Sequence, residues 1–121
     1  MLFRAHRVRK TLRAGLYFGY NLARMRYEIV LAPEAVDDLR RLRAQERTAV
    51  TKAMETHLRK QPEMTSRSRI KRLRGLSRPQ YRLRVGEVRV FYDIAGPAVE
   101  VLAIISKPEV DEWLAQFGSP K

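Results

Sequence analysis

The feature that most constrains the fold is the segment 81–94, where polar and apolar residues alternate on both sides of a Gly-Glu pair. Alternation with a period of two predicts two β-strands that each bury one face. Glycine in the first of two loop positions is typical of a type II′ hairpin turn, so we expect the strands to be joined at Gly86 and Glu87. This turn dictates a register in which Val85 lies opposite Val88.

The predicted register divides the side chains of the hairpin between two faces. The apolar face consists of Tyr81, Leu83, Val85, Val88, Val90, Tyr92 and Ile94, and the other face of Arg82, Arg84, Arg89, Phe91 and Asp93. We expect the first face to pack in the core. On the second face Arg84 lies opposite Arg89, although like charges opposite each other destabilise a sheet. We interpret this arrangement as a site for a polyanion; the alternative is that the long side chains spread into water.

The residues before the hairpin predict a strand and two helices. Apolar and polar residues alternate at 27–31, which is typical of a strand. Pro33 fits the first turn of a helix, and apolar residues follow it at helical spacing. A second helix is predicted for 45–60, because apolar residues recur there at the same spacing and Pro62 stops it. His57 lies beside this apolar stripe, and we expect it to contribute to packing.

The residues on either side of the hairpin are less regular. Residues 63–80 lack periodicity and predict a basic surface loop that includes, at most, a short strand around 70–73. The nearly continuous apolar run at 99–105 predicts a central strand. Ser106 and Glu109 fit a capping box, which predicts a short C-terminal helix.

This order of elements, β-α-α-β-β-β plus a short C-terminal helix, predicts an α+β fold with a small antiparallel sheet. We expect the two helices to cover one sheet face and the arginines to occupy the other. A chain of 121 residues has the length of one domain. It contains no cysteine and two histidines, so thiol chemistry and a His-rich metal site lack the necessary residues. We therefore expect no metal, no cofactor and, since no long apolar run is present, no membrane contact.

The positive charge, +12 in total, is concentrated in two segments. Residues 1–24 hold six Lys or Arg residues and no acidic residue, and residues 65–92 hold nine against Glu87 alone. Clusters of this density attract polyanions, with nucleic acid first among them. Residues 1–24 show no regular period. We interpret them either as a flexible basic extension or as a segment upstream of a translation start at Met25.

Three segments carry a resemblance to a known family: MRYEIVLAPEAVDDL at 25–39, KRLRGL at 71–76 and YRLRVGEVRVFY at 81–92. In this order and spacing the chain resembles the RelE/ParE toxin superfamily of bacterial type II toxin–antitoxin systems, and within it the RelE branch. We therefore predict a RelE-like toxin domain at 25–118.

The resemblance implies a ribosome-dependent endoribonuclease, an mRNA interferase that cleaves translated mRNA and is silenced by a cognate antitoxin. In such toxins basic residues surround the scissile phosphate. The positions that match them, which we expect to be catalytic, are Arg82, Arg84, Arg89 and Lys107. The residues expected to contact RNA are Lys71, Arg72, Arg74, Arg78, Phe91 and Trp113.

Trp113 departs from the family pattern, since its position often holds a tyrosine proposed to act as an acid or base. Tryptophan has no ionisable proton and cannot serve as a general base. It can stack on a nucleotide base, but its place on the apolar stripe of the last helix favours packing. The general base of the reaction is therefore unassigned.

The remaining chemistry is consistent with RNA cleavage without a metal, in which the 2′-hydroxyl attacks the neighbouring phosphate and arginines stabilise the developing charge. Two alternatives stay open: a ParE-like inhibitor of gyrase, and a catalytically inactive module that binds RNA or an antitoxin. We expect a cognate antitoxin, the ribosome and mRNA as partners, and DNA only indirectly through the antitoxin. The expected location is the bacterial cytoplasm.

Overall fold

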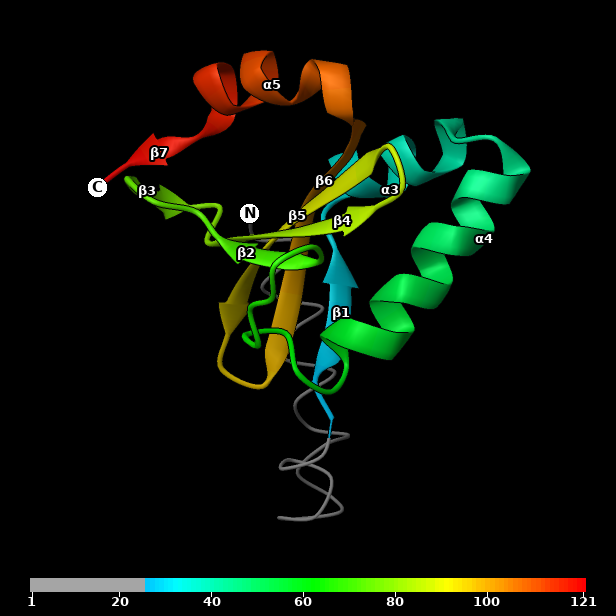
Figure 1. The fold of residues 1–121 in the computed structure, drawn as a ribbon, viewed down its shortest axis with the longest axis horizontal. Helices are drawn as coiled ribbons and strands as arrows, with labels where there is room; N and C mark the ends of the chain where they lie inside the picture. The colour runs from blue at the N-terminus through cyan, green and yellow to red at the C-terminus, as the bar shows by residue number, and fades with distance from the viewer. Residues whose placement is uncertain (1–25) are drawn as a thin grey trace.

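Residues 26–121 are described by a computed structural model, shown in Figure 1. The predicted extension at 1–24 lies outside this range. The elements are β1 (Glu28–Leu31), α3 (Pro33–Arg41), α4 (Ala44–Ala53), η1 (Met54–Leu58), β2 (Ile70–Arg72), β3 (Leu76–Arg78), β4 (Tyr81–Val85), β5 (Val88–Ala95), β6 (Ala98–Ser106), η2 (Lys107–Glu109), α5 (Val110–Phe117) and β7 (Ser119–Pro120). The predicted α+β class is confirmed.

Within this range the main sheet has five strands in the order β1-β6-β5-β4-β2. The pairs β4–β5 and β5–β6 are antiparallel, as predicted, and the short strand β2 adds an antiparallel pair with β4. The pair β1–β6 is parallel, with Ile29 beside Val99. The helices carry the chain from the β1 edge to the opposite edge of the sheet. Strands β4, β5 and β6 then follow one another back across the sheet, and β6 lies beside β1 and runs in the same direction.

The β4–β5 hairpin has the predicted register. Val85 pairs with Val88, and Leu83 pairs with Val90. Gly86 has a φ of 60°, and no residue other than glycine in the described range has a positive φ. Positive φ at the first turn position alone distinguishes a type II′ turn from type I′, so the turn predicted from glycine placement is confirmed.

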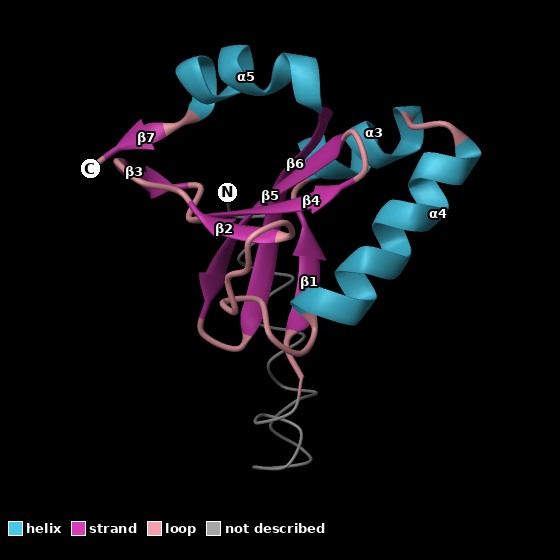
Figure 2. Ribbon diagram, in the orientation of Figure 1, coloured by secondary structure: helices cyan, strands magenta, loops and turns pink. Residues whose placement is uncertain are grey.

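Helices α3 and α4 cover the apolar face of the sheet, as Figure 2 shows. Val50, Met54 and Leu58 follow one another at intervals of four residues and are buried against Leu83 and Val90. This spacing places all three on one helix face. Helix α4 continues into η1, a π-helical turn that ends two residues before the predicted helix end.

Tyr92 is the largest completely buried side chain of this core. Its ring stacks on Tyr81 with a centroid distance of 5.4 Å. Its hydroxyl group donates a hydrogen bond of 2.5 Å to the carbonyl oxygen of Pro62, which fixes the loop after η1 against the sheet. Burial raises the pKa of Tyr92 above its ordinary value.

The entry into α5 differs from the prediction, because the side chain of Ser106 makes no capping hydrogen bond. Ser106 is still paired with Val88 at the end of β6. The next backbone N–H, that of Lys107, donates to the carbonyl of Glu87 at 2.8 Å. The hairpin turn therefore holds the start of the helical segment, and the predicted capping box is wrong.

Sequence analysis missed a second, two-stranded sheet formed by β3 and β7 within the described range. Leu76 pairs with Pro120, and Arg78 pairs with Ser119. The hydroxyl of Ser77 also donates to the carbonyl of Ser119 at 3.2 Å. Strands of two or three residues are too short to show a period, so only long-range pairing reveals them.

Among residues 26–121, no helix has the length and apolar character that crossing a membrane requires.

We predict that the Tyr92→Phe variant is less stable near neutral pH by about 0.5–1.5 kcal/mol, because the hydrogen bond to Pro62 is lost. Since the folded-state pKa of Tyr92 is raised, its contribution is complete below the unfolded-state pKa of about 10 and declines as the pH rises above it. Urea titrations at several pH values measure both effects. A parent protein whose stability falls no more steeply at alkaline pH than that of Tyr92→Phe would contradict the prediction.

Candidate anion-binding site

The face of the hairpin turned away from α3 and α4 carries the predicted cluster of arginines. Arg84 lies opposite Arg89, and Arg82 lies opposite Phe91, so the three guanidinium-bearing chains share one face. Burial, and then the positive charges of Arg89 and Arg84, lower the pKa of Arg82 below its ordinary value. Lys71 pairs with Arg82 from the edge strand β2 and adds a fourth cation to this face.

Among residues 26–121 the arginine cluster has no carboxylate partner. In the described part of the chain the ion pairs involve other arginines, and Arg82, Arg84 and Arg89 take part in none of them. The Nε atom of Arg82 is buried without a hydrogen-bond partner. A buried donor left unpaired costs about 1–3 kcal/mol, and more when it is charged. A phosphate group accepts two guanidinium hydrogen bonds at once, and its negative charge would offset the repulsion among the three arginines.

Arg89 contributes its charge from within the protein. Its side chain is buried, with 7% of the residue exposed. One guanidinium nitrogen, Nη1, donates to the carbonyl oxygens of Gly86 and Val88 at 2.8 and 3.1 Å. Arg89 thus stabilises the hairpin turn, and Arg84 is the exposed arginine of the cross-strand pair.

Lys107 and Arg69 lie next to the cluster. Lys107 is exposed, and its backbone hydrogen bond to Glu87 places it beside the hairpin turn. Arg69 is also exposed, and its carbonyl accepts the backbone N–H of Arg84 at 2.8 Å. Sequence analysis did not single out Arg69. The available signal was its membership of the basic segment 65–92.

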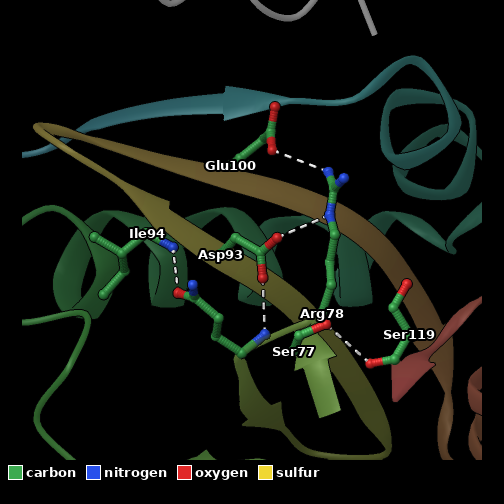
Figure 3. Close-up of polar contacts among 7 residues, drawn as sticks. Ser77, Arg78, Asp93, Ile94, Glu100 and Ser119 are labelled. Atoms are coloured by element: carbon green, nitrogen blue, oxygen red, sulfur yellow. Dashed lines mark hydrogen bonds and ion pairs between the residues drawn. The ribbon is translucent and has the colours of Figure 1, made fainter. Parts of the chain in front are cut away.

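Arg78, predicted as an RNA contact, does not join the cluster and forms ion pairs elsewhere on the sheet. Its Nε lies 2.9 Å from Oδ2 of Asp93, and its Nη2 lies 3.2 Å from Oε1 of Glu100 (Figure 3). The backbone N–H of Gln80 donates to the other oxygen of Asp93 at 2.7 Å. Burial raises the pKa of Asp93, although the Gln80 and Arg78 contacts act in the opposite direction. Arg78 therefore attaches the β3 segment to the sheet.

Two further basic residues of the predicted RNA-contact set occupy other surroundings. Arg72 pairs with Tyr81, so it lies on the face opposite to Lys71. Its guanidinium carbon lies 5.0 Å from the centre of the Tyr81 ring, within the range of a cation–π contact. Arg74 is exposed in the turn next to Gly75. Lys71 is thus the member of the KRLRG segment that faces the arginine cluster.

An aromatic stack lies next to the cluster on the same face. Trp113 of α5 stacks on Phe91 with a centroid distance of 5.0 Å and an angle of 16° between the rings. Phe91, predicted as an RNA contact, is 0% exposed and lies under the Trp113 ring. Trp113 is partly exposed, and Phe117 packs on it in a tilted arrangement at 5.6 Å. Trp113 therefore combines the packing role favoured by its sequence position with an accessible surface.

The described residues include no group of three or more His, Cys, Asp or Glu side chains placed to hold a metal ion. His57 lies in η1, within the helical layer. Burial, and then the charge of Arg69, lower its pKa. The cationic face carries the charge needed to bind an anion. None of the residues described on this face is an evident general base.

Comparisons with known proteins agree with this fold. Residues 29–110 match the family model of the ParE toxin of type II toxin–antitoxin systems, parDE. The RelB–RelE antitoxin–toxin complex from Methanococcus jannaschii aligns with a TM-score of 0.53 and 16% identity, over 69% of this chain and 95% of that chain. The archaeal RelE–RelB complex from Pyrococcus horikoshii OT3 aligns with a TM-score of 0.57 and 20% identity, over 69% and 97%. No curated protein sequence matches significantly.

The fold is that of a RelE-like toxin. The chain belongs to the ParE toxin family, within the RelE/ParE superfamily of type II toxin–antitoxin toxins that the sequence resemblance indicated.

We predict that replacing Arg78 with methionine destabilises the domain by about 1–2 kcal/mol. This value is below the cost of breaking a fully buried pair, because the Arg78 side chain is 37% exposed. The exposed Arg74→Met serves as the control and should change stability by less than about 0.5 kcal/mol. Urea unfolding of both variants measures the difference. Equal stabilities would show that Arg78 has no structural role.

Proposed function

We propose that this toxin is an endoribonuclease that cleaves mRNA during translation and that its reaction depends on the cationic sheet face. The supporting observation is the cluster of Arg82, Arg84 and Arg89, which has no carboxylate partner in the described part of the chain and includes a buried, unpaired Nε. A fold can place its arginines in ion pairs, as this one does with Arg78. Keeping three together at an energetic cost is favourable when a phosphate group is bound there.

The proposed reaction is an internal transfer at the RNA phosphate. The 2′-hydroxyl gives up its proton to water as its oxygen forms a bond to phosphorus, the bond from phosphorus to the 5′-oxygen breaks, and the leaving oxygen takes up a proton from water. The products are a 2′,3′-cyclic phosphate and a 5′-hydroxyl. Between the reactant and the products, negative charge increases on the phosphoryl oxygens. In this proposal Arg82, Arg84 and Lys107 stabilise that charge, and the buried Arg89 adds to the positive potential of the face.

The ribosome would supply what the site lacks. The described face offers cations but no evident base for the 2′-hydroxyl proton. Alignment of the 2′-oxygen with the leaving oxygen can by itself provide a large part of a rate enhancement. An RNA strand held in that geometry by the ribosome would then need mainly charge stabilisation from the toxin. Trp113, partly exposed beside Phe91, is placed to stack on a base next to the phosphate.

Inhibition of gyrase is the second candidate, because the matching family model is that of a ParE toxin. A toxin of that kind would act on a protein–DNA complex and would leave mRNA intact. The cationic face would then provide electrostatic attraction without catalysis.

We further propose that a cognate antitoxin is the physiological partner and that both proteins act in the bacterial cytoplasm. The two similar structures are toxin–antitoxin complexes, which supports a partner of this kind. An antitoxin with acidic residues over Arg84 and Lys107 would neutralise the face that we assign to RNA. DNA contact is expected to come from the antitoxin.

The test of the RNase proposal is brief induction of the full chain in bacteria, followed by primer-extension mapping of a reporter mRNA. Cleavage should be confined to translated regions. The Arg84→Ala/Lys107→Ala double variant removes two exposed cations without touching the hairpin turn, and it should reduce cleavage by about 10²-fold or more. The matched control, Arg40→Ala/Lys52→Ala, removes the same charge from exposed positions on the helices and should cleave like the parent.

Two other outcomes are informative. Growth arrest with intact mRNA, together with inhibited DNA supercoiling by gyrase, would replace the RNase proposal with the second candidate. Equal loss of cleavage in both double variants would indicate that total charge, rather than the arginine face, determines activity.

A further inference from the structure

A second surface feature, separate from the arginine cluster, is a groove of about 570 Å³ between α3 and α5 (Figure 1), which we call the acidic groove. Its floor is apolar, because Leu102 and Ile105 of β6 line it together with Trp113 and Phe117 of α5. Phe117 is 59% exposed, so a large aromatic surface is open to a partner there.

The α3 wall of this groove is acidic, although the whole chain has a net charge of +12. Among residues 26–121, Glu34 and Asp37 form no ion pair. Arg41 and Arg78 also line the groove, but both are engaged in ion pairs of their own. The charge available in the groove is therefore negative, and a segment that fits it is cationic and apolar.

The described domain has such a segment at 60–69, which we call the Met64 loop. Met64 is 56% exposed, and it and Phe117 are the two exposed large hydrophobic residues of the described range. The charged residues of the loop are three basic and one acidic: Lys60, Arg67, Arg69 and Glu63. None of them forms an ion pair within residues 26–121. The loop therefore complements the acidic groove in both charge and apolar character.

Hydrogen bonds hold the Met64 loop in one shape. The hydroxyl of Tyr92 donates to the carbonyl of Pro62. The backbone N–H of Ser66 donates to the carbonyl of Ile70 at 2.9 Å, and the hydroxyl oxygen of Ser66 accepts the backbone N–H of Arg69 at 3.0 Å. A loop that is already ordered loses little conformational freedom when it binds a partner.

The Met64 loop and the acidic groove lie too far apart to meet within one molecule. Met64 and Tyr27 line a common pocket just before β1, and the next residue, Glu28, pairs with Ala98. Ile105 on the groove floor lies seven residues further along β6. At the usual rise of a strand this separation is roughly 23 Å. A second copy of the chain can bring the two surfaces together.

We propose that copies of this chain associate head to tail, with the Met64 loop of one copy in the acidic groove of the next. Met64 then packs on Phe117, and the basic residues of the loop lie against Glu34 and Asp37. At physiological ionic strength the Debye length is about 8 Å, so repulsion between the two net charges is largely screened beyond the contact, where the local charges are opposite.

The two surfaces that meet are different, so the contact is heterologous and leaves one loop and one groove free in every dimer. Association therefore continues beyond the dimer. It also covers Trp113, which lines the groove and which we placed against an RNA base in the proposed reaction. Head-to-tail association does not depend on the RNase assignment, because it involves no RNA.

Sedimentation equilibrium of the full chain, free of nucleic acid and at physiological ionic strength, measures this association. Between about 10 μM and 1 mM, the range in which weak contacts become occupied, the weight-average mass should rise more than about twofold. The Glu34→Gln/Asp37→Asn variant, altered in the groove, and the Met64→Ser/Arg67→Ser variant, altered in the loop, should both remain monomeric.

The matched control, Glu46→Gln/Glu87→Gln, removes two carboxylates beside the hairpin turn and should associate like the parent. An equimolar mixture of the groove variant and the loop variant should form dimers and nothing larger, because each supplies the one surface that the other lacks. Association in the mixture also shows that neither variant is unfolded.

The proposal is overturned if the parent stays monomeric over the whole concentration range, if either variant associates like the parent, or if the mixture stays monomeric. A monomeric parent whose groove variant fails to bind the antitoxin would overturn it as well, and would assign the acidic groove to that partner.

Discussion

The pairing of β4 with β5 around Gly86 is the constraint on which the rest of the structure depends. Because side chains alternate along a strand, a slip of one residue would move Leu83 and Val90 out of the core and bring Arg82 into it. The type II′ turn prevents this slip, and Arg89 holds the turn through hydrogen bonds to Gly86 and Val88. The same pairing that buries the apolar face therefore assembles the cationic one.

The arginines of the domain fall into two groups, which differ in whether they have carboxylate partners among the described residues. Arg78 pairs with Asp93 and Glu100, which are distant in sequence. Arg59 pairs with Glu55, one helical turn away. Arg82, Arg84 and Arg89 face one another without such partners. Local conflicts of this kind are tolerated at functional sites, where the rest of the fold offsets their cost. The buried Nε of Arg82 is the point at which that cost is greatest.

The predictions succeeded where the deciding interactions are local in sequence. The hairpin register, the helix stripe through Val50 and Leu58, and the strand beginning near Val99 all follow from the period of apolar residues. The capping box failed, because Ser106 remains paired in β6 and its side chain makes no capping hydrogen bond. The Ser-x-x-Glu pattern is present, but the strand pairing of Ser106 with Val88 is set by a segment distant in sequence.

By itself, the sequence determined the α+β class, the two faces of the hairpin and the presence of a basic surface, because alternation, helical spacing and charge are properties of neighbouring residues. The tertiary structure decided which basic residues share that surface. Arg78 meets Asp93 and Glu100, and Phe91 lies under Trp113, because segments far apart in sequence pack together. The parallel pairing of β1 with β6 and the acidic groove between α3 and α5 have the same origin. Contacts of this kind depend on the packing of whole elements, which no short sequence window contains.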